Sequence, residues 1–214
     1  MRSRAVTVVQ AILVVNAFPA FVNLMSIPDR TDHWFVWTVK PAANARALGV
    51  MYGSACLLGL LGYAARTWPR QRVTFVVEER RHGGRLPVET PFTLGGRAAV
   101  AVLAALLLAA GIGLLFELSY ATRLWPFAIT PLVARILGVW LGCLGLGHVW
   151  TVWDGDRLRA RALLLSIPPT GVLLALVPLL HRDDLRDGAT GARVAYLLLA
   201  GAMAVLPLTA LRSR

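Results

Sequence analysis

The sequence predicts an all-α integral membrane protein with six transmembrane helices arranged as helical-hairpin repeats. Mean hydropathy is +0.64 and 57% of the residues are hydrophobic, well above the share in a soluble domain. Six apolar runs of about 20 residues follow one another, and a helix of that length crosses roughly 30 Å of hydrocarbon. A nine-residue segment also recurs along the chain. Because backbone in lipid must satisfy its own hydrogen bonds, each run is expected to be a helix.

The first apolar run follows Met-Arg-Ser-Arg and contains Ala17–Ala20, which together resemble a cleavable signal peptide. The run continues past that point to Met25, which favours a retained helix, and cleavage remains the alternative. The chain lacks the short alternating segments that a β-barrel needs. The six expected helices are 5–25, 44–65, 97–118, 131–153, 160–180 and 193–211.

The repeat is the segment 45–53, which recurs as 134–142 with six identical residues of nine and no gap. Each copy follows an aromatic loop that contains proline. Units of two helices keep their orientation, so their symmetry axis is expected along the membrane normal, unlike the inverted repeats of many transporters. A third hairpin is either a diverged copy or an unrelated pair. The expected division is a first hairpin at 1–65, a cytoplasmic loop at 66–96, a second hairpin at 97–153 and the third hairpin at 154–214.

The loop at about 66–96 carries two β-branched runs on either side of Gly83-Gly84. This pattern predicts a small β-hairpin. The alternative is a basic loop without regular structure, lying near anionic lipid.

The net charge of +11 is explained by membrane topology. Of the 22 Lys and Arg residues, fourteen lie at the two termini and in the loops on their side, and eight lie on the other side. The excess of positive charge marks the cytoplasmic side. We therefore expect a multi-pass protein of the cell inner (cytoplasmic) membrane with both termini in the cytoplasm. Nucleic acid is not an expected partner.

The second helix of each hairpin carries small residues at a fixed spacing after an arginine. The first set follows Arg46 and the second follows Arg135. At about 100° per residue, each set falls on one narrow face, and small residues let helix backbones approach closely. The predicted helix-packing stripe comprises Gly49, Gly53, Gly138, Gly142 and Gly145. The two arginines have two interpretations: structural residues that tie a loop to the bundle, or an anion-binding site.

Glu117 is an acidic residue near the end of an otherwise apolar helix, and Asn23 occupies the comparable place in the first hairpin. A buried carboxylate needs a partner, so Glu117 is expected to pair with an arginine, Arg135 above all. Tryptophans in the two aromatic loops are typical of the membrane interface, although they could also form the lip of a pocket. The candidate binding or ion-pair site is therefore Arg46, Arg135, Glu117, Asn23, Trp37 and Trp125.

The other reactive residues carry weaker signals. His148 is isolated, and Cys56 and Cys143 are expected to be small apolar fillers. Pro168-Pro169 predicts a kink or break in the fifth helix. Motifs for phosphate loops, dinucleotides, zinc hydrolysis and nucleophilic catalysis are missing from the sequence. No catalytic residue, metal ligand or cofactor is predicted.

The expected function is a non-enzymatic scaffold or accessory subunit of a membrane complex, because the repeated features are packing features. The alternative is a small-solute or ion transporter with an arginine-lined outer site. A membrane enzyme ranks third. The expected partners are the lipid bilayer and either other membrane subunits or a second copy of the chain.

Overall fold

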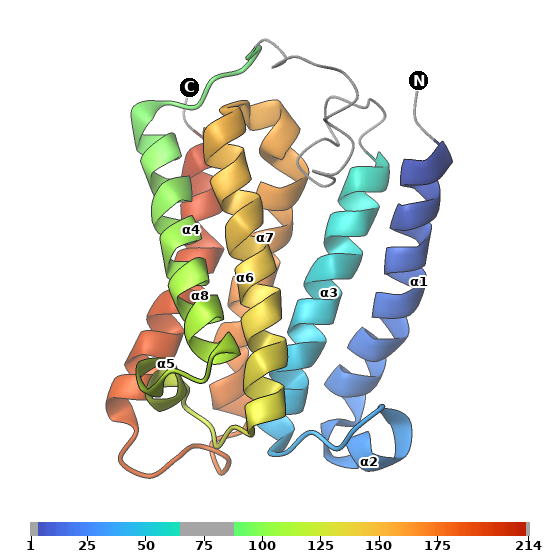
Figure 1. Ribbon diagram of the computed structural model, residues 1–214, viewed down its shortest axis with the longest axis vertical. Helices are drawn as coiled ribbons and strands as arrows, with labels where there is room; N and C mark the ends of the chain where they lie inside the picture. Colours follow the sequence, from blue (N-terminus) through green and yellow to red (C-terminus); the bar gives the residue numbers. More distant parts are fainter. Residues whose placement is uncertain (1–3, 65–87, 213–214) are drawn as a thin grey trace.

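The computed structural model describes residues 4–64 and 88–212, and these residues form a helical bundle (Figure 1). The part of the chain described contains no strand, only isolated β-bridges at Pro91–Asp156 and Phe127–Leu185. Its helices are α1 (Arg4–Ser26), the 3-10 turn η1 (Pro28–Arg30), α2 (Thr31–Trp34), α3 (Ala42–Ala64), α4 (Leu94–Leu115), α5 (Ser119–Leu124), α6 (Pro131–Asp154), α7 (Arg157–Leu180) and α8 (Thr190–Arg212).

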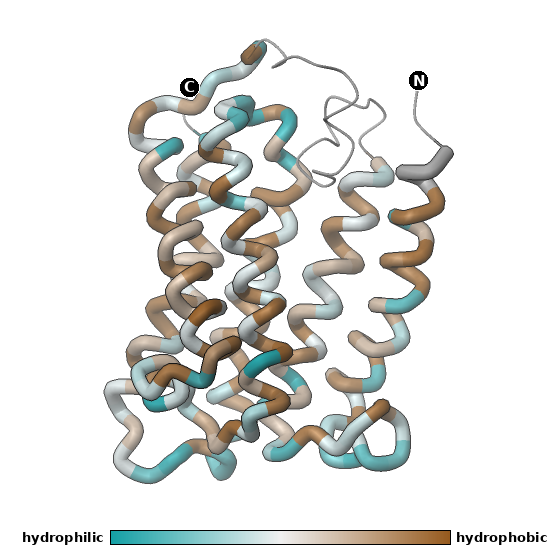
Figure 2. Tube along the Cα trace, in the orientation of Figure 1, coloured by the Kyte–Doolittle hydropathy of each residue, from teal (hydrophilic) through white to brown (hydrophobic). Residues whose placement is uncertain are grey.

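Six of these helices are long and apolar enough to cross a membrane: α1, α3, α4, α6, α7 and α8. Apolar residues dominate their length, and hydrophilic residues concentrate in the connections at both ends of the bundle (Figure 2). Side chains such as Val15, Phe18 and Leu198 are exposed on the outside of the bundle, as expected where lipid takes the place of water. The structure is consistent with the predicted helical membrane protein, and six long helices occur where the apolar runs predicted them.

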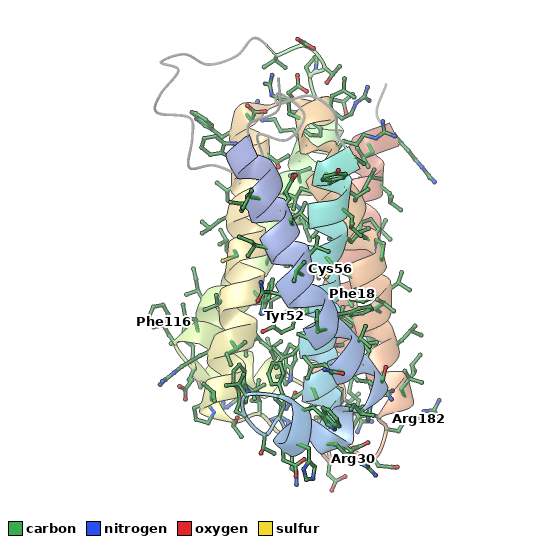
Figure 3. The ribbon with its side chains drawn as sticks, turned by 90° about the vertical axis from the view of Figure 1, so that its right-hand side faces the viewer. Phe18, Arg30, Tyr52, Cys56, Phe116 and Arg182 are labelled. Carbon is green, nitrogen blue, oxygen red and sulfur yellow. The ribbon has the colours of Figure 1, made fainter. Side chains whose placement is uncertain are left out.

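Each pair of consecutive long helices packs together: α1 with α3, α4 with α6, and α7 with α8. Viewed from the side, α1 crosses in front of α3 (Figure 3). The third pair connects the other two, because α7 packs on α3 and α8 packs on α4. The direct contact between α3 and α6 is slight by comparison. The α7–α8 pair therefore holds the other two pairs together.

Glycines set the closest helix contacts within the first two pairs. A methyl group placed on Gly53 would lie 2.7 Å from the Phe21 ring of α1. One placed on Gly138 would lie 2.7 Å from the carbonyl oxygen of Gly111 in α4 and would contact the Leu115 nitrogen. Gly53 and Gly138 thus face the partner helix of their own pair, whereas a methyl group on Gly142 of the predicted stripe would meet no atom within 4 Å. The expectation that Arg135 shares this packed face is wrong, because 63% of its side chain is exposed.

The sequence predicted a kink or a break at Pro168-Pro169. A break is wrong, because α7 is one continuous helix from Arg157 to Leu180. Two prolines remove two backbone donors and leave the remaining hydrogen bonds of the helix in place. The flanking hydroxyls bond back to the helix: Ser166 donates to the Leu163 carbonyl at 2.8 Å, and Thr170 to the Ser166 carbonyl at 2.9 Å. Packing against α3 and α8 supports α7 along its length.

The two aromatic loops contain short helices, α2 and α5, that the sequence pattern did not predict. Most of the predicted β-hairpin at 66–96 lies outside the described residues. In the described part, residues 88–93 run without regular structure to the start of α4, and Pro91 forms a β-bridge with Asp156.

Candidate functional site

Polar side chains of the described residues gather at the two ends of the bundle (Figure 2). The loop end comprises the connections 27–41, 116–130 and 181–189. The terminus end comprises the start of α4 and the turn between α6 and α7, on the side where both chain termini lie (Figure 1).

Asn44 is the centre of the loop end. It lies in the first turn of α3 and is fully buried. Its Oδ1 accepts a hydrogen bond of 2.9 Å from the indole Nε1 of Trp125, and its Nδ2 donates to the carbonyls of Ala128, at 2.7 Å, and Lys40, at 3.3 Å. One amide therefore links α3 of the first hairpin to the loop of the second.

The connection between α7 and α8 joins the same cluster. Asp184 accepts a hydrogen bond of 3.0 Å from the backbone nitrogen of Ala43 and lies 3.2 Å from His181 Nδ1. A carboxylate here also complements the positive end of the α3 dipole. Arg186 donates through its guanidinium to the carbonyls of Arg123, at 2.6 Å, and Trp125. All three loops are thereby tied into one cap.

Trp125 belongs to the core of this cap and is only 5% exposed. Its ring meets Tyr196 edge to face at 5.2 Å, and the Tyr196 hydroxyl donates to the Leu174 carbonyl at 3.1 Å. Trp125 also lines an apolar pocket of about 330 Å³ together with Tyr196, which agrees with the alternative that the loop tryptophans border a pocket. Trp37 is half-buried and packs at 4.7 Å against Phe35.

The six candidate site residues do not form one cluster. Arg135 Nη2 lies 2.7 Å from Glu117 Oε1, which is the partner that the sequence analysis expected. Arg46 is half-buried and has no ion-pair partner among the residues described. Asn23 is also half-buried, and its side chain forms no hydrogen bond with another described residue. A cleft of about 650 Å³ lies between the beginnings of α3 and α6, and neither arginine lines it.

The Glu117–Arg135 pair is expected to contribute at most about 1 kcal/mol to stability, because the two side chains are 30% and 63% exposed. This contribution to stability is smaller than that of a buried ion pair. Glu117→Gln and Arg135→Gln, singly and together, should therefore show a coupling free energy below about 1 kcal/mol in a detergent melt. A coupling of about 3 kcal/mol would show that the pair is buried in the membrane-embedded protein.

The terminus end contains a buried ion-pair cluster around Asp156, which precedes α7. Arg159 is 5% exposed, with its Nε 2.7 Å from Asp154 Oδ2 and its Nη1 3.6 Å from Asp156 Oδ2. Asp156 is 2% exposed and accepts hydrogen bonds from four backbone nitrogens and from the Thr90 hydroxyl; the four nitrogens are those of Glu89, Thr90, Leu158 and Arg159. Asp156 therefore caps α7 and fastens the approach to α4 onto the α6–α7 turn.

The hydrogen bonds at Asp156 also control its ionisation. Burial is the largest single influence and raises the pKa of the carboxyl. The hydrogen bonds from Thr90, Arg159 and Glu89 act in the opposite direction and together hold the pKa below its ordinary value. The carboxylate form is the one that this end of the bundle stabilises.

Between the two ends, several polar side chains bond to the backbone of their own helix. Thr151 donates to the Gly147 carbonyl at 3.0 Å, and Ser166 and Thr170 do the same within α7. The fully buried His148 places Nδ1 2.7 Å from the Leu144 carbonyl. No group of three or more His, Cys, Asp or Glu side chains suited to a metal occurs among the residues described.

The sequence analysis missed Asn44, Asp184 and the Asp156–Arg159 pair. Asn44 had a detectable signal, since it is a polar residue between alanines immediately before the repeated segment. Asp156 also had one, because an Asp after Gly155 and before an apolar run is typical of a helix N-cap. Asp184 had no local signal, because it contacts a helix 141 positions away.

Comparison with protein-family models, with curated proteins and with solved structures finds no match to the chain.

Proposed function

We propose that this chain is a non-enzymatic scaffold or accessory subunit of a membrane complex. The proposal rests on the hydrogen-bond partners of polar groups among the described residues. At the ends of the bundle they bond to each other and to loop carbonyls, as Asn44 and Asp156 do. Inside the bundle, Thr151, Ser166 and Thr170 bond to their own helices. These groups support a structural role, and within residues 4–64 and 88–212 they form no series of side chains arranged for catalysis.

The proposal includes the helical-hairpin repeat. The two matched segments lie in α3 and α6, and both helices pack through their glycines on the helix that precedes them. A duplicated unit of this kind suits a body that presents similar lateral faces to other membrane subunits or to a second copy of itself. The lateral faces of α1 and α8 are apolar and exposed in the single chain.

We further propose that both termini face the cytoplasm and that the protein resides in the cell inner membrane. The arginine asymmetry of the sequence supports this orientation, and the two termini lie at the same end of the bundle (Figure 1). Single cysteines replacing Arg123 and Asp183 should then react with an impermeant maleimide added outside whole cells, whereas one replacing Arg157 should not. The reverse labelling pattern would overturn the orientation.

The scaffold proposal is tested by purifying the chain from its own membranes in a mild detergent. A protein partner at fixed stoichiometry, or a stable homo-oligomer, is the expected result. The exposed substitution Val139→Trp on α6 and the matched Val205→Trp on α8 then report which lateral face makes the contact, because both side chains are more than half exposed in the single chain. A chain that migrates as a monomer without a partner would contradict the proposal.

One observation favours the transporter alternative. Arg46 begins the α3 stripe, and its Nε is buried without a hydrogen-bond partner among the described residues, which is the behaviour of a cation that awaits an anion. Liposomes that contain the purified chain alone distinguish the two functions. Anion flux that Arg46→Gln abolishes and Arg135→Gln leaves intact would support the transporter and contradict the scaffold.

A further inference from the structure

A cavity of about 750 Å³ lies between the first hairpin and α6. It exists because α3 packs on α7 while α6 packs on α4, so that α3 and α6 touch only slightly (Figure 1). Four helices provide its walls: Leu13 of α1, Ser54 of α3, Trp140 and Trp150 of α6, and Leu163 of α7. Among these residues the polar atoms are those of one hydroxyl and two indoles.

The cavity opens sideways, toward the region where lipid surrounds the bundle. Three lining residues of α6 are exposed at the surface: Leu146 at 61%, Val149 at 44% and Trp153 at 47%. They lie in a helix that is apolar and long enough to cross the membrane. A molecule that enters through this opening must therefore come from the bilayer.

Two hydrogen-bond donors of the cavity wall have no partner in the part of the chain that the structure describes. Ser54 is 5% exposed and its Oγ is buried without a hydrogen bond. The indole Nε1 of Trp150 is likewise buried and unpaired. Buried polar groups are nearly always bonded, so two unpaired donors on the wall of one cavity call for an acceptor inside it.

The aromatic residues of the wall indicate a flat ligand. Trp140, Trp150 and Trp153 all line the cavity, and the last two rings lie 4.6 Å apart. An interfacial belt does not explain Trp140, which is ten residues into the 24-residue α6 and packs on Tyr52 at 5.2 Å. Aromatic side chains stack favourably on planar rings.

The volume of the cavity and the lack of charge on its described lining residues further restrict the class of ligand. The volume falls in the range of small-molecule pockets, about 300–1,000 Å³. A transmembrane helix 10 Å wide and 30 Å long would need roughly 2,400 Å³, so it does not fit. No Asp, Glu, Lys or Arg among the described residues lines the cavity, so a charged head group would be unpaired there.

We propose that this cavity binds a quinone-type lipid, with its neutral carbonyl-bearing ring against the tryptophans of the wall and its apolar tail leaving through the lateral opening. The carbonyl oxygens accept hydrogen bonds from the Ser54 hydroxyl and the Trp150 indole. The ring stays neutral and only binds, so no electron transfer is part of the proposal. Binding is independent of whether the chain also has a protein partner.

The test uses the full chain in nanodiscs of synthetic phosphatidylcholine and a fully ring-substituted benzoquinone with a decyl tail. The melting temperature, followed by circular dichroism, should rise with quinone concentration and saturate, since a ligand that binds only the folded protein stabilises it. Ser54→Ala combined with Trp150→Phe should weaken the apparent affinity at least tenfold. Cys143→Trp, which fills the cavity from its exposed edge, should abolish the saturable rise.

The matched control is Val139→Trp, which adds the same ring to the exposed face of α6 outside the cavity lining and should bind like the unmodified chain. Decylbenzene, which has the tail and a ring but no carbonyl, should give no saturable rise. An equal rise with decylbenzene, or a rise that Cys143→Trp leaves unchanged, would overturn the proposal. These two comparisons remain decisive even if the double variant does not fold.

Discussion

Gly138→Ala is expected to lower the free energy of unfolding by about 3 kcal/mol, the upper end of the usual cost of overpacking. The added methyl group would lie 2.7 Å from the Gly111 carbonyl oxygen and would contact the backbone nitrogen of Leu115. Both neighbours are backbone atoms of α4, so they cannot rotate away as a side chain could. The two helices must separate, and the close packing that holds a membrane hairpin together is lost. Unfolding in a detergent titration measures the change.

Gly142→Ala provides a matched control four residues further along the same helix. A methyl group there would meet no atom within 4 Å, although the backbone of Gly142 itself lies against Gly111. We expect this variant to keep the stability of the unmodified chain within about 0.5 kcal/mol or to gain slightly from the helix propensity of alanine. Equal losses from the two substitutions would show that α4 and α6 do not approach through Gly138.

The positions of the six long helices along the chain were largely predictable, because length and hydropathy alone decide which segments can cross a bilayer. The glycine spacing after Arg46 and Arg135 identified a face of α3 and of α6, since helical geometry fixes the angle between residues seven apart. The same argument failed for Arg135. A long flexible side chain at the end of a stripe can extend away from the face on which its Cα lies, and this one reaches outward to Glu117.

The cap at the loop end was beyond sequence reasoning, because its contacts join residues that are far apart in the chain. Asn44 meets Trp125 across 81 positions, and Asp184 meets Ala43 across 141. No local periodicity records such a pair. The bridging position of α7 and α8 was unpredictable for the same reason: hydropathy shows that a helix spans the membrane and says nothing about its neighbours.

Arg159 shows how one charge can serve a structural role that a topology count overlooks. The sequence analysis counted it among the loop arginines that set orientation, but it lies in the first turn of α7 and is 5% exposed. Its position beside Asp154 and Asp156 makes it part of the packing at the terminus end. Counting charges by loop is therefore sound for orientation and incomplete for stability.

Asp156→Ala is expected to destabilise the protein by about 3–5 kcal/mol, the usual cost of removing one member of a buried ion pair. The substitution removes one of the two carboxylates that pair with Arg159. It also removes the acceptor of the hydrogen bonds that four backbone nitrogens and the Thr90 hydroxyl donate. It also removes the cap of α7. A thermal melt in detergent at neutral pH measures the loss, and Asp183→Ala, at an exposed position of the opposite end, is the control with little expected effect.

The pH dependence identifies the carboxylate as the cause. Because the pKa of Asp156 is lowered in the folded protein, its contribution is fully present above the unfolded value of about 3.9 and is lost as the pH falls through the folded value. The difference in melting temperature between the unmodified chain and Asp156→Asn should therefore be constant from pH 7 to about 5 and should shrink below about pH 4. Asparagine keeps the size of the side chain and one acceptor oxygen. The part of the melting-temperature difference that disappears in acid is therefore due to the charge of the carboxylate. A difference that persists unchanged at pH 3 would show that Asp156 acts through the hydrogen bonds that its second oxygen accepts and not through its charge.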